Sequence, residues 1–322
     1  MPNHILMLIS FLLLSFQGEC CFRANPKLPP QGECGVPFFE PSGTENASHI
    51  SSRIVKRIVN GDSSVPNSWP WMVSIRLKSA NTSHFCSGSL VYPGYVHTTA
   101  HCFNARNYNG SAFTIRPIAG NYTGSNFLII VGLSSLNLGM SQGEEGVYFV
   151  SDLIIHPQYD RSNGQNDIAF LKLSSPVTLT NKVQLICLPP SSSDYLVSSV
   201  YEKFIMGVGW GRTSAGPNDP SENSNDLKQA ELEVLSPNDS RCKANSYYDP
   251  TLMYCVLGVR RGTNFCWGDS GGPMSVLLDG KWTVFGNTNT LVVKPDGSCD
   301  PLFPAYYTKL PLYLNWMATF IK

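Results

Sequence analysis

Short apolar runs separated by clusters of Gly, Pro, Asn and Ser fill most of the chain after residue 57. The runs are rich in β-branched and aromatic residues, and turn residues bound each of them, which is typical of β-strands. Short strands at this spacing predict an all-β architecture built from barrels. Apolar residues at helical spacing occur only near the end, where residues 312–321 predict a C-terminal α-helix. The clearest strands are expected at residues 72–77, 89–92, 127–131, 147–155, 168–173 and 282–285.

The N-terminal part has a different pattern. Residues 5–16 form an apolar run that is too short to span a bilayer. We interpret residues 1–20, with an approximate end, as a signal peptide, although no Lys or Arg precedes the apolar run. Residues 21–57 are rich in Pro, Gly and Ser and predict an extended pro-segment rather than a packed domain. These features predict a secreted, extracellular protein without a membrane span.

Composition narrows the function. The 322 residues include 23 basic and 23 acidic side chains, so the formal net charge is zero. No dense run of Lys or Arg occurs, so nucleic acid is not expected as a partner. Ten cysteines in a secreted chain predict disulfides, whose connectivity spacing alone leaves open. Sequons, which also arise by chance, predict glycosylation at Asn46, Asn81, Asn109, Asn121 and Asn238.

The most informative stretch is Gly-Asp-Ser-Gly-Gly-Pro at residues 268–273. A serine hydroxyl is a poor nucleophile unless a base removes its proton and donors stabilise the oxyanion. The glycines around Ser270 let backbone N–H groups approach a reacting carbonyl, because they lack a Cβ. The string also fits the nucleophile elbow of α/β-hydrolases, in which the histidine follows the serine. The last histidine here is His156, so the base must precede Ser270 and the elbow is excluded.

Two upstream segments supply partners for Ser270. His101 lies beside Cys102 at the end of a β-branched run, and Asp167 heads the apolar run 168–173. This order of His, Asp and Ser resembles the trypsin/chymotrypsin family of serine proteases. The resemblance covers residues 58–322 and implies two antiparallel Greek-key β-barrels with a C-terminal α-helix.

The resemblance also implies roles. His101 would act as general base and then as general acid, and Asp167 would hold its tautomer. The backbone N–H groups of Gly268 and Ser270 would form the oxyanion hole. Two alternatives compete: a buried structural histidine, or zinc bound by His97 and His101. The zinc alternative is disfavoured, because the glutamate of H-E-x-x-H is missing and the pair is expected on a strand. No metal or cofactor is expected.

Activation is a second implication. Lys56 and Arg57 precede Ile58-Val-Asn-Gly, where family members are cleaved to create a new N-terminus. The ammonium of Ile58 would fold inward and pair with Asp269, because a buried carboxylate is costly without a partner. The alternative is an ordinary basic dipeptide on a flexible loop.

The resemblance pairs eight cysteines and leaves Cys20 and Cys21 unassigned. A further bridge common in the family is expected to be absent, because Ile205 and Val276 occupy its positions. The implied pairs are Cys34–Cys187, Cys86–Cys102, Cys242–Cys255 and Cys266–Cys299.

The primary pocket departs from trypsin. Asn264, six residues before Ser270, stands where trypsin-like members carry aspartate, and its amide cannot neutralise Lys or Arg. Leu291 and Ala305 replace glycines of the pocket walls, so the pocket is expected to be short, as in elastases. Cleavage after small or medium apolar residues follows, unless a loop insertion misplaces these residues. Asn289 and Thr290 replace the serine and aromatic residue of the family's substrate platform.

Two functions remain in competition. The first is a secreted elastase- or chymotrypsin-like serine endopeptidase, made as a zymogen and activated by cleavage after Arg57. The alternative is a non-catalytic protease homologue acting as a binding or regulatory module, which the altered platform keeps open. A purely structural glycoprotein would not explain the triad. Expected partners of a monomeric enzyme are protein or peptide substrates, an activating protease, and serpin-like or small protein inhibitors.

Overall fold

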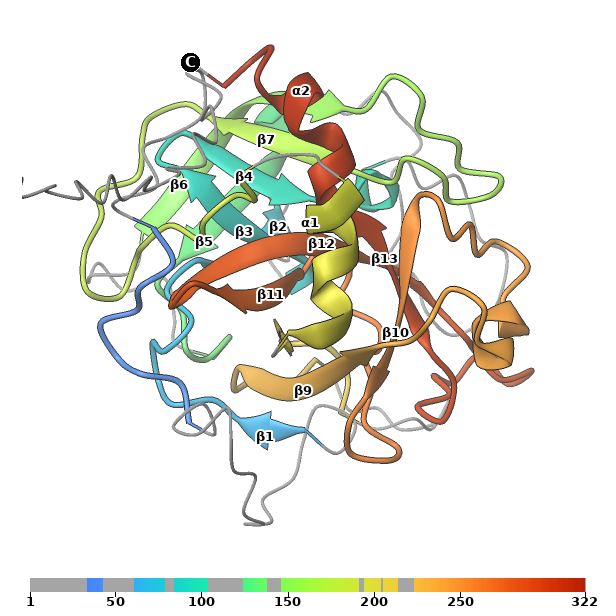
Figure 1. Ribbon diagram of the computed structural model, residues 1–322. Helices are drawn as coiled ribbons and strands as arrows, with labels where there is room; N and C mark the ends of the chain where they lie inside the picture. The colour runs from blue at the N-terminus through green and yellow to red at the C-terminus, as the bar shows by residue number, and fades with distance from the viewer. Residues whose placement is uncertain are drawn as a thin grey trace, which may run out of the picture.

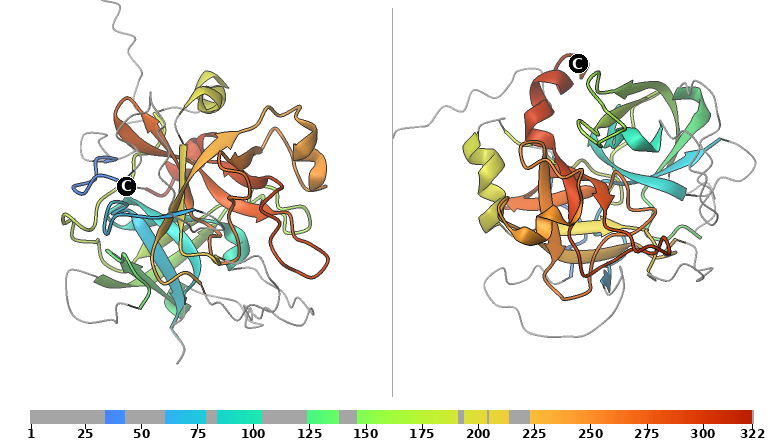
Figure 2. Two further views of the ribbon diagram at one scale, coloured as in Figure 1. Left: turned by 90° about the horizontal axis from the view of Figure 1, so that it is seen from below. Right: turned by 90° about the vertical axis from the view of Figure 1, so that its right-hand side faces the viewer.

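A computed structural model gives the arrangement of the chain (Figure 1). It describes residues 34–42, 61–78, 84–103, 124–137, 146–190, 194–203, 205–213 and 223–321. Two closed β-barrels dominate it, which confirms the predicted fold class. Figure 2 shows them side by side, the first in cyan to green and the second in yellow to red.

The two barrels have the same antiparallel strand order. In the first, β2-β3-β4-β7-β6-β5 closes through β5 and β2, and in the second, β9-β10-β13-β12-β11-β8 closes through β8 and β9. A short strand, β1 (Asp62–Ser63), pairs with the first two residues of β9, Lys228 and Gln229. The first barrel consists of β2 (Met72–Leu77), β3 (His84–Tyr92), β4 (Tyr95–Thr98), β5 (Phe127–Val131), β6 (Gly146–Ile155) and β7 (Ala169–Leu173). The second consists of β8 (Ile205–Gly209), β9 (Lys228–Val234), β10 (Met253–Gly258), β11 (Pro273–Leu278), β12 (Lys281–Leu291) and β13 (Ala305–Lys309).

Helices are short. Besides the C-terminal helix they are α1 (Asp194–Ser199) and the 3₁₀ turns η2 (Ala100–Cys102), η3 (Gly124–Asn126), η4 (Val200–Glu202) and η5 (Ser240–Ala244). Within the described ranges, no helix has the length and apolar character needed to cross a membrane.

The C-terminal helix is shorter than residues 312–321. The chain first forms the 3₁₀ turn η6 (Leu310–Tyr313), which contains a proline, and then α2 (Leu314–Met317). Beyond Met317 the chain tightens again, because Phe320 N donates to Met317 O three residues back. The helix prediction is therefore confirmed in place, and its length is wrong.

Strand β12 extends well beyond the predicted residues 282–285. Its second half is polar, yet Asn287, Thr288 and Asn289 are all buried. They are tolerated because the backbones of Asn287 and Thr288 pair with neighbouring strands and all three side chains find hydrogen-bond partners. This polar, buried half of β12 lies between the two barrels and becomes important at the site.

The barrels pack through one shared apolar cluster. Trp69 of the first half contacts Trp282 on β12, with ring centroids 4.8 Å apart, and Trp210 belongs to the same cluster. The interior of the second barrel forms a separate cluster that includes Phe265 and Tyr307. The two barrels are therefore joined by a close-packed apolar cluster.

Four disulfides join the described cysteines in the pairs that the resemblance implies. Ile205 and Val276 are direct partners on β8 and β11, and both are buried, so apolar contact occupies the place of the missing bridge. The bridges are Cys34–Cys187, Cys86–Cys102, Cys242–Cys255 and Cys266–Cys299.

Several predictions concern residues that the structure does not describe. Asn238 is described and lies exposed in a turn. The predictions that lie outside the described residues are the signal peptide at residues 1–20, Cys20 and Cys21, the activation residues Arg57 and Ile58, and the sequons at Asn46, Asn81, Asn109 and Asn121.

Candidate active site

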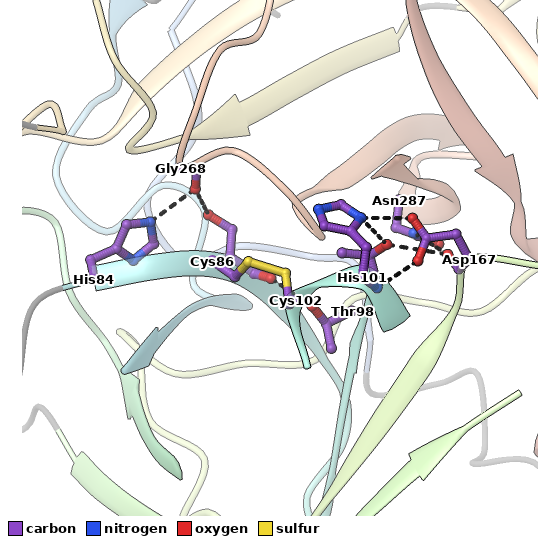
Figure 3. Close-up of a disulfide and its surroundings, with 10 residues drawn as sticks. His84, Cys86, Thr98, His101, Cys102, Asp167, Gly268 and Asn287 are labelled. Atoms are coloured by element: carbon purple, nitrogen blue, oxygen red, sulfur yellow. Dashed lines mark hydrogen bonds and ion pairs between the residues drawn. A yellow bond between two sulfur atoms is a disulfide. The ribbon is translucent and has the colours of Figure 1, made fainter. Parts of the chain in front are cut away.

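His101 and Asp167 are in direct contact (Figure 3). His101 lies in η2, which the Cys86–Cys102 disulfide ties to β3. Its backbone N donates to Asp167 Oδ1 at 2.8 Å, and its Nδ1 lies 2.7 Å from Asp167 Oδ2. A carboxylate only accepts, so the Nδ1 of a neutral His101 carries the proton and Nε2 keeps a free lone pair. The His101 side chain is 34% exposed and that of Asp167 only 1%, so the basic nitrogen belongs to an accessible ring with a buried acid behind it.

The backbone of Asp167 is also held in place. It follows Asn166, whose φ of 52° turns the chain sharply into β7. The Asp167 carbonyl accepts hydrogen bonds from Asn287 Nδ2 at 2.9 Å and Thr308 Oγ1 at 3.0 Å, and from Thr99 Oγ1 at 3.3 Å. Donors from both barrels thus converge on the peptide that carries the carboxylate.

The loop of Ser270 packs against the segment that leads into His101. Gly271 has a φ of +81°, and a Cβ there would collide with Thr98 Oγ1 and Ser87 O, so a glycine is required. Ser87 N donates to Ser270 O at 2.8 Å. The close approach of Gly271 to residues 98 and 99 brings the serine loop beside the loop of the histidine.

Gly268 is held by its carbonyl. Its oxygen accepts from His84 Nε2 at 3.0 Å and from Ser87 Oγ at 3.2 Å (Figure 3). Among the described residues, neither Gly268 N nor Ser270 N has an acceptor. Two backbone donors beside the serine are therefore available to a ligand oxygen.

Asp269 is a buried carboxylate that backbone N–H groups hold in place. Its Oδ1 accepts from Gly211 N at 2.7 Å and its Oδ2 from Cys266 N at 3.0 Å. Gly209 and Gly211 press against the carboxylate, where any side chain would displace it. Burial raises the pKa of Asp269 to about 7, and no basic group of the described chain pairs with it.

The three pocket residues come together around the Cys266–Cys299 disulfide. Leu291 packs against both cysteines and against the interior of the second barrel. Ala305 is its direct partner on β13 and is fully buried. Asn264 is buried, with Nδ2 donating to Phe303 O at 2.6 Å and Oδ1 accepting from Phe265 N at 2.8 Å. The nitrogen and the oxygen of the Asn264 amide each have a partner within the protein, and none of these three residues carries a charge.

Asn289 has a structural connection that the sequence did not suggest. The β12–β13 ladder shifts register between Thr288 and Thr290, so Asn289 sits at a bulge. Its Nδ2 donates to Gly164 O at 2.9 Å and lies 3.2 Å from Thr308 Oγ1. The amide therefore fastens the loop that precedes Asp167 to the second barrel.

Sequence reasoning missed the roles of two buried histidines. His84 holds the carbonyl of Gly268, and burial lowers the pKa of His84 to about 4. His97 lies on β4, contacts Ser89 and Asn287, and has its pKa lowered to about 3 by burial. The expectation that His101 shares its strand is wrong, because His101 lies in η2. A histidine within an otherwise apolar strand was the only available signal.

His156 packs against aromatic side chains of the C-terminal segment. His156 is partly buried between the rings of Tyr313 and Trp316, with centroids 5.0 and 4.8 Å away. The part of the chain that the structure describes contains no group of three His, Cys, Asp or Glu side chains able to hold a metal ion.

A comparison with protein families agrees with this geometry. The family model described as Trypsin matches residues 58–317, which is most of the chain and includes both barrels. The chain therefore belongs to the trypsin family of serine proteases.

Proposed function

We propose that the protein is a secreted serine endopeptidase, made as a zymogen, that cleaves after small or medium apolar residues. The observation that carries the proposal is the contact of His101 Nδ1 with the buried Asp167, which leaves the lone pair on Nε2, while the Ser270 loop packs against the segment that leads into His101. Family membership supports the reaction class, and the geometry supports the assignment of these three residues to the triad.

Catalysis follows from the proton positions. His101 Nε2 removes the proton of Ser270 Oγ as the oxygen attacks the scissile carbonyl, and later gives that proton to the leaving amine. Asp167 stabilises the imidazolium that forms in between. The free N–H groups of Gly268 and Ser270 then bind the oxyanion, each contributing about 3 kcal/mol to the transition state.

Activation is proposed to pass through Asp269. Cleavage after Arg57 would create an ammonium at Ile58, and the buried carboxylate of Asp269 is the anion that it would meet. The raised pKa of Asp269 supports this, because its site disfavours negative charge until a cation arrives. This pairing would act first on the backbone of Gly268 and Ser270, because these two residues flank Asp269.

The short pocket is supported by two contacts. Leu291 packs on the Cys266–Cys299 disulfide, and Asn264 spends its amide on Phe303 O and Phe265 N. A substrate Lys or Arg would thus find no anion and little depth, whereas Ala, Val or Leu would bury its side chain on Leu291.

The competing function is a binding module that has lost catalysis. The bulge at Asn289 favours it, because the strand beside the pocket departs from regular pairing there. Secretion, glycosylation at the five sequons, and inhibition by serpin-like or small reactive-loop proteins belong to the proposed endopeptidase and need direct tests.

The test is a cleavage profile. The secreted zymogen is cleaved after Arg57 and given a mixed peptide library, with Ser270→Ala treated identically. Cuts after Ala, Val or Leu that the variant lacks would support the enzyme and its short pocket. Cuts after Arg or Lys would refute the pocket assignment. Absence of both cuts and labelling by a serine-directed phosphonate would support the binding module.

A further inference from the structure

A buried series of hydrogen-bonded side chains connects the first barrel to the backbone of Asp167. Ser89 Oγ lies 3.4 Å from His97 Nδ1, and His97 Nε2 lies 3.1 Å from Asn287 Oδ1. Asn287 Nδ2 then donates to Asp167 O at 2.9 Å. His97 and Asn287 are both completely buried and 190 residues apart in sequence.

The Asp167 carbonyl sets the donor-to-acceptor direction of every hydrogen bond in this series of side chains. A carbonyl can only accept, so the Asn287 amide must present its NH₂ to Asp167 and its oxygen to His97. His97 Nε2 therefore carries the ring proton, and Nδ1 is left to accept from Ser89. Burial lowers the pKa of His97 to about 3, so the ring remains neutral and the direction does not reverse at physiological pH.

Asn287 lies next to the residue that holds the nucleophile loop. Gly271 N donates to Thr288 O, and Thr288 N donates to Gly272 O, both at 3.0 Å. Two consecutive residues of β12 thus hold the two loops. The Asn287 side chain holds the loop of Asp167, and the Thr288 backbone holds the loop of Ser270. Figure 3 shows Asn287 directly beside Asp167.

We propose that Asn287, oriented by His97, is a positioning residue that sets the place of Asp167 relative to His101. The proposal rests on the proposed catalytic function of the triad. Asn287 touches neither substrate nor His101, and its effect passes through the Asp167 backbone. A displacement of about 1 Å at a reacting group can reduce a rate by about 100-fold, so loss of this donor should be visible in turnover.

Two variants separate the effect of Asn287 on the position of Asp167 from its effect on protein stability. Asn287→Leu removes the donor to Asp167 and leaves the His97 N–H without an acceptor, so both kcat and Tm should fall. The double variant His97→Leu/Asn287→Leu replaces the polar pair by an apolar contact and should recover part of the Tm, because only Ser89 Oγ then loses a partner, at 3.4 Å. If Asn287 positions Asp167, kcat stays about 10- to 100-fold low in the double variant, with KM within about twofold of wild type.

The matched control is Tyr95→Phe. Tyr95 lies on the same strand as His97, and the substitution removes one partly buried hydrogen bond, from Tyr95 Oη to Phe320 O at 2.7 Å. It should lower Tm and leave kcat unchanged. His97→Leu alone keeps the Asn287 donor and should reduce kcat less than Asn287→Leu does.

A second measurement does not depend on turnover. The proton between His101 Nδ1 and Asp167 Oδ2 gives a deshielded NMR signal, which should shift or broaden in Asn287→Leu and in the double variant but not in Tyr95→Phe. Wild-type kcat in the double variant, or an unchanged signal in both variants, would overturn the proposal. A cleaved wild-type protein that shows this signal but no turnover would refute the proposed enzyme, and the signal of the variants would still decide the role of Asn287.

Discussion

His84 Nε2 donates a hydrogen bond to Gly268 O across the boundary between the two barrels, at 3.0 Å. On its other side, His84 Nδ1 lies 2.9 Å from Ser74 Oγ. Both ring nitrogens are thus used by the neutral imidazole, which fixes the peptide two residues before Ser270. The proposed oxyanion hole therefore depends on a residue of the barrel that does not carry the serine.

This relationship gives a pH prediction. The pKa of His84 is about 4 in the folded protein and 6.5 in the unfolded chain, so the unfolded chain takes up a proton first as the pH falls. His84 should therefore reduce the unfolding free energy between pH 6.5 and 4, by about 2 kcal/mol at pH 5, and have no effect above that range. Urea unfolding at pH 7 and pH 5 should show a smaller pH effect in His84→Gln than in wild type. Equal pH effects would contradict the assignment.

For Asp269 we expect the opposite pH dependence of the unfolding free energy. Its folded pKa of about 7 lies above the unfolded value of 3.8, so the uncleaved protein should lose stability as the pH rises from 4 to 7. Asp269→Asn removes this cost, about 4 kcal/mol at pH 8, and should make the uncleaved protein more stable there by roughly 3 kcal/mol, after about 1 kcal/mol for the lost acceptor of Cys266 N. The measurement is urea unfolding of the uncleaved protein at pH 5 and pH 8. The same variant, cleaved after Arg57, should be inactive, and an active cleaved variant would exclude the proposed ion pair.

The pocket predicts an exchange of specificity. In Leu291→Gly/Ala305→Gly the side chain on the Cys266–Cys299 disulfide is removed, so Phe and Tyr should fit. The ratio of kcat/KM for Phe over Ala substrates should rise about tenfold or more. Leu278→Gly is the matched control, because Leu278 also packs partly buried on the interior of the second barrel, at the far end of β11. A rise in the control as well would indicate general loosening.

The fold could be predicted from the sequence for a physical reason, because the barrel strands are apolar and bounded by turns. The proposed triad of His101, Asp167 and Ser270 is recognisable because these residues stand in short motifs whose order resembles that of the trypsin/chymotrypsin family. Asn287 and Asn289 could not be assigned, because a polar run reads as the end of a strand unless its partners are known. Those partners, His97 and Gly164, lie far away in sequence and come from the other barrel or its loops.

The tether between the pro-segment and the protease gives the last prediction. Cys34 is bonded to Cys187 across 153 residues, and Gly35 makes 2.8 Å backbone hydrogen bonds with Leu185 and Trp282. Cleavage after Arg57 should therefore leave the pro-segment attached: one band on a non-reducing gel and two after reduction. In the uncleaved protein, Cys34→Ser/Cys187→Ser should reduce the unfolding free energy by up to about 5 kcal/mol, because a loop of 153 residues is no longer closed in the unfolded chain. After cleavage the same variant should release the pro-segment. It should keep its activity, since Cys187 pairs with Trp282 and Thr283 at the start of β12, whereas the loops of Asp167 and Ser270 are held by Asn287 and Thr288. Loss of activity at unchanged stability would instead assign the attached pro-segment a part in the site.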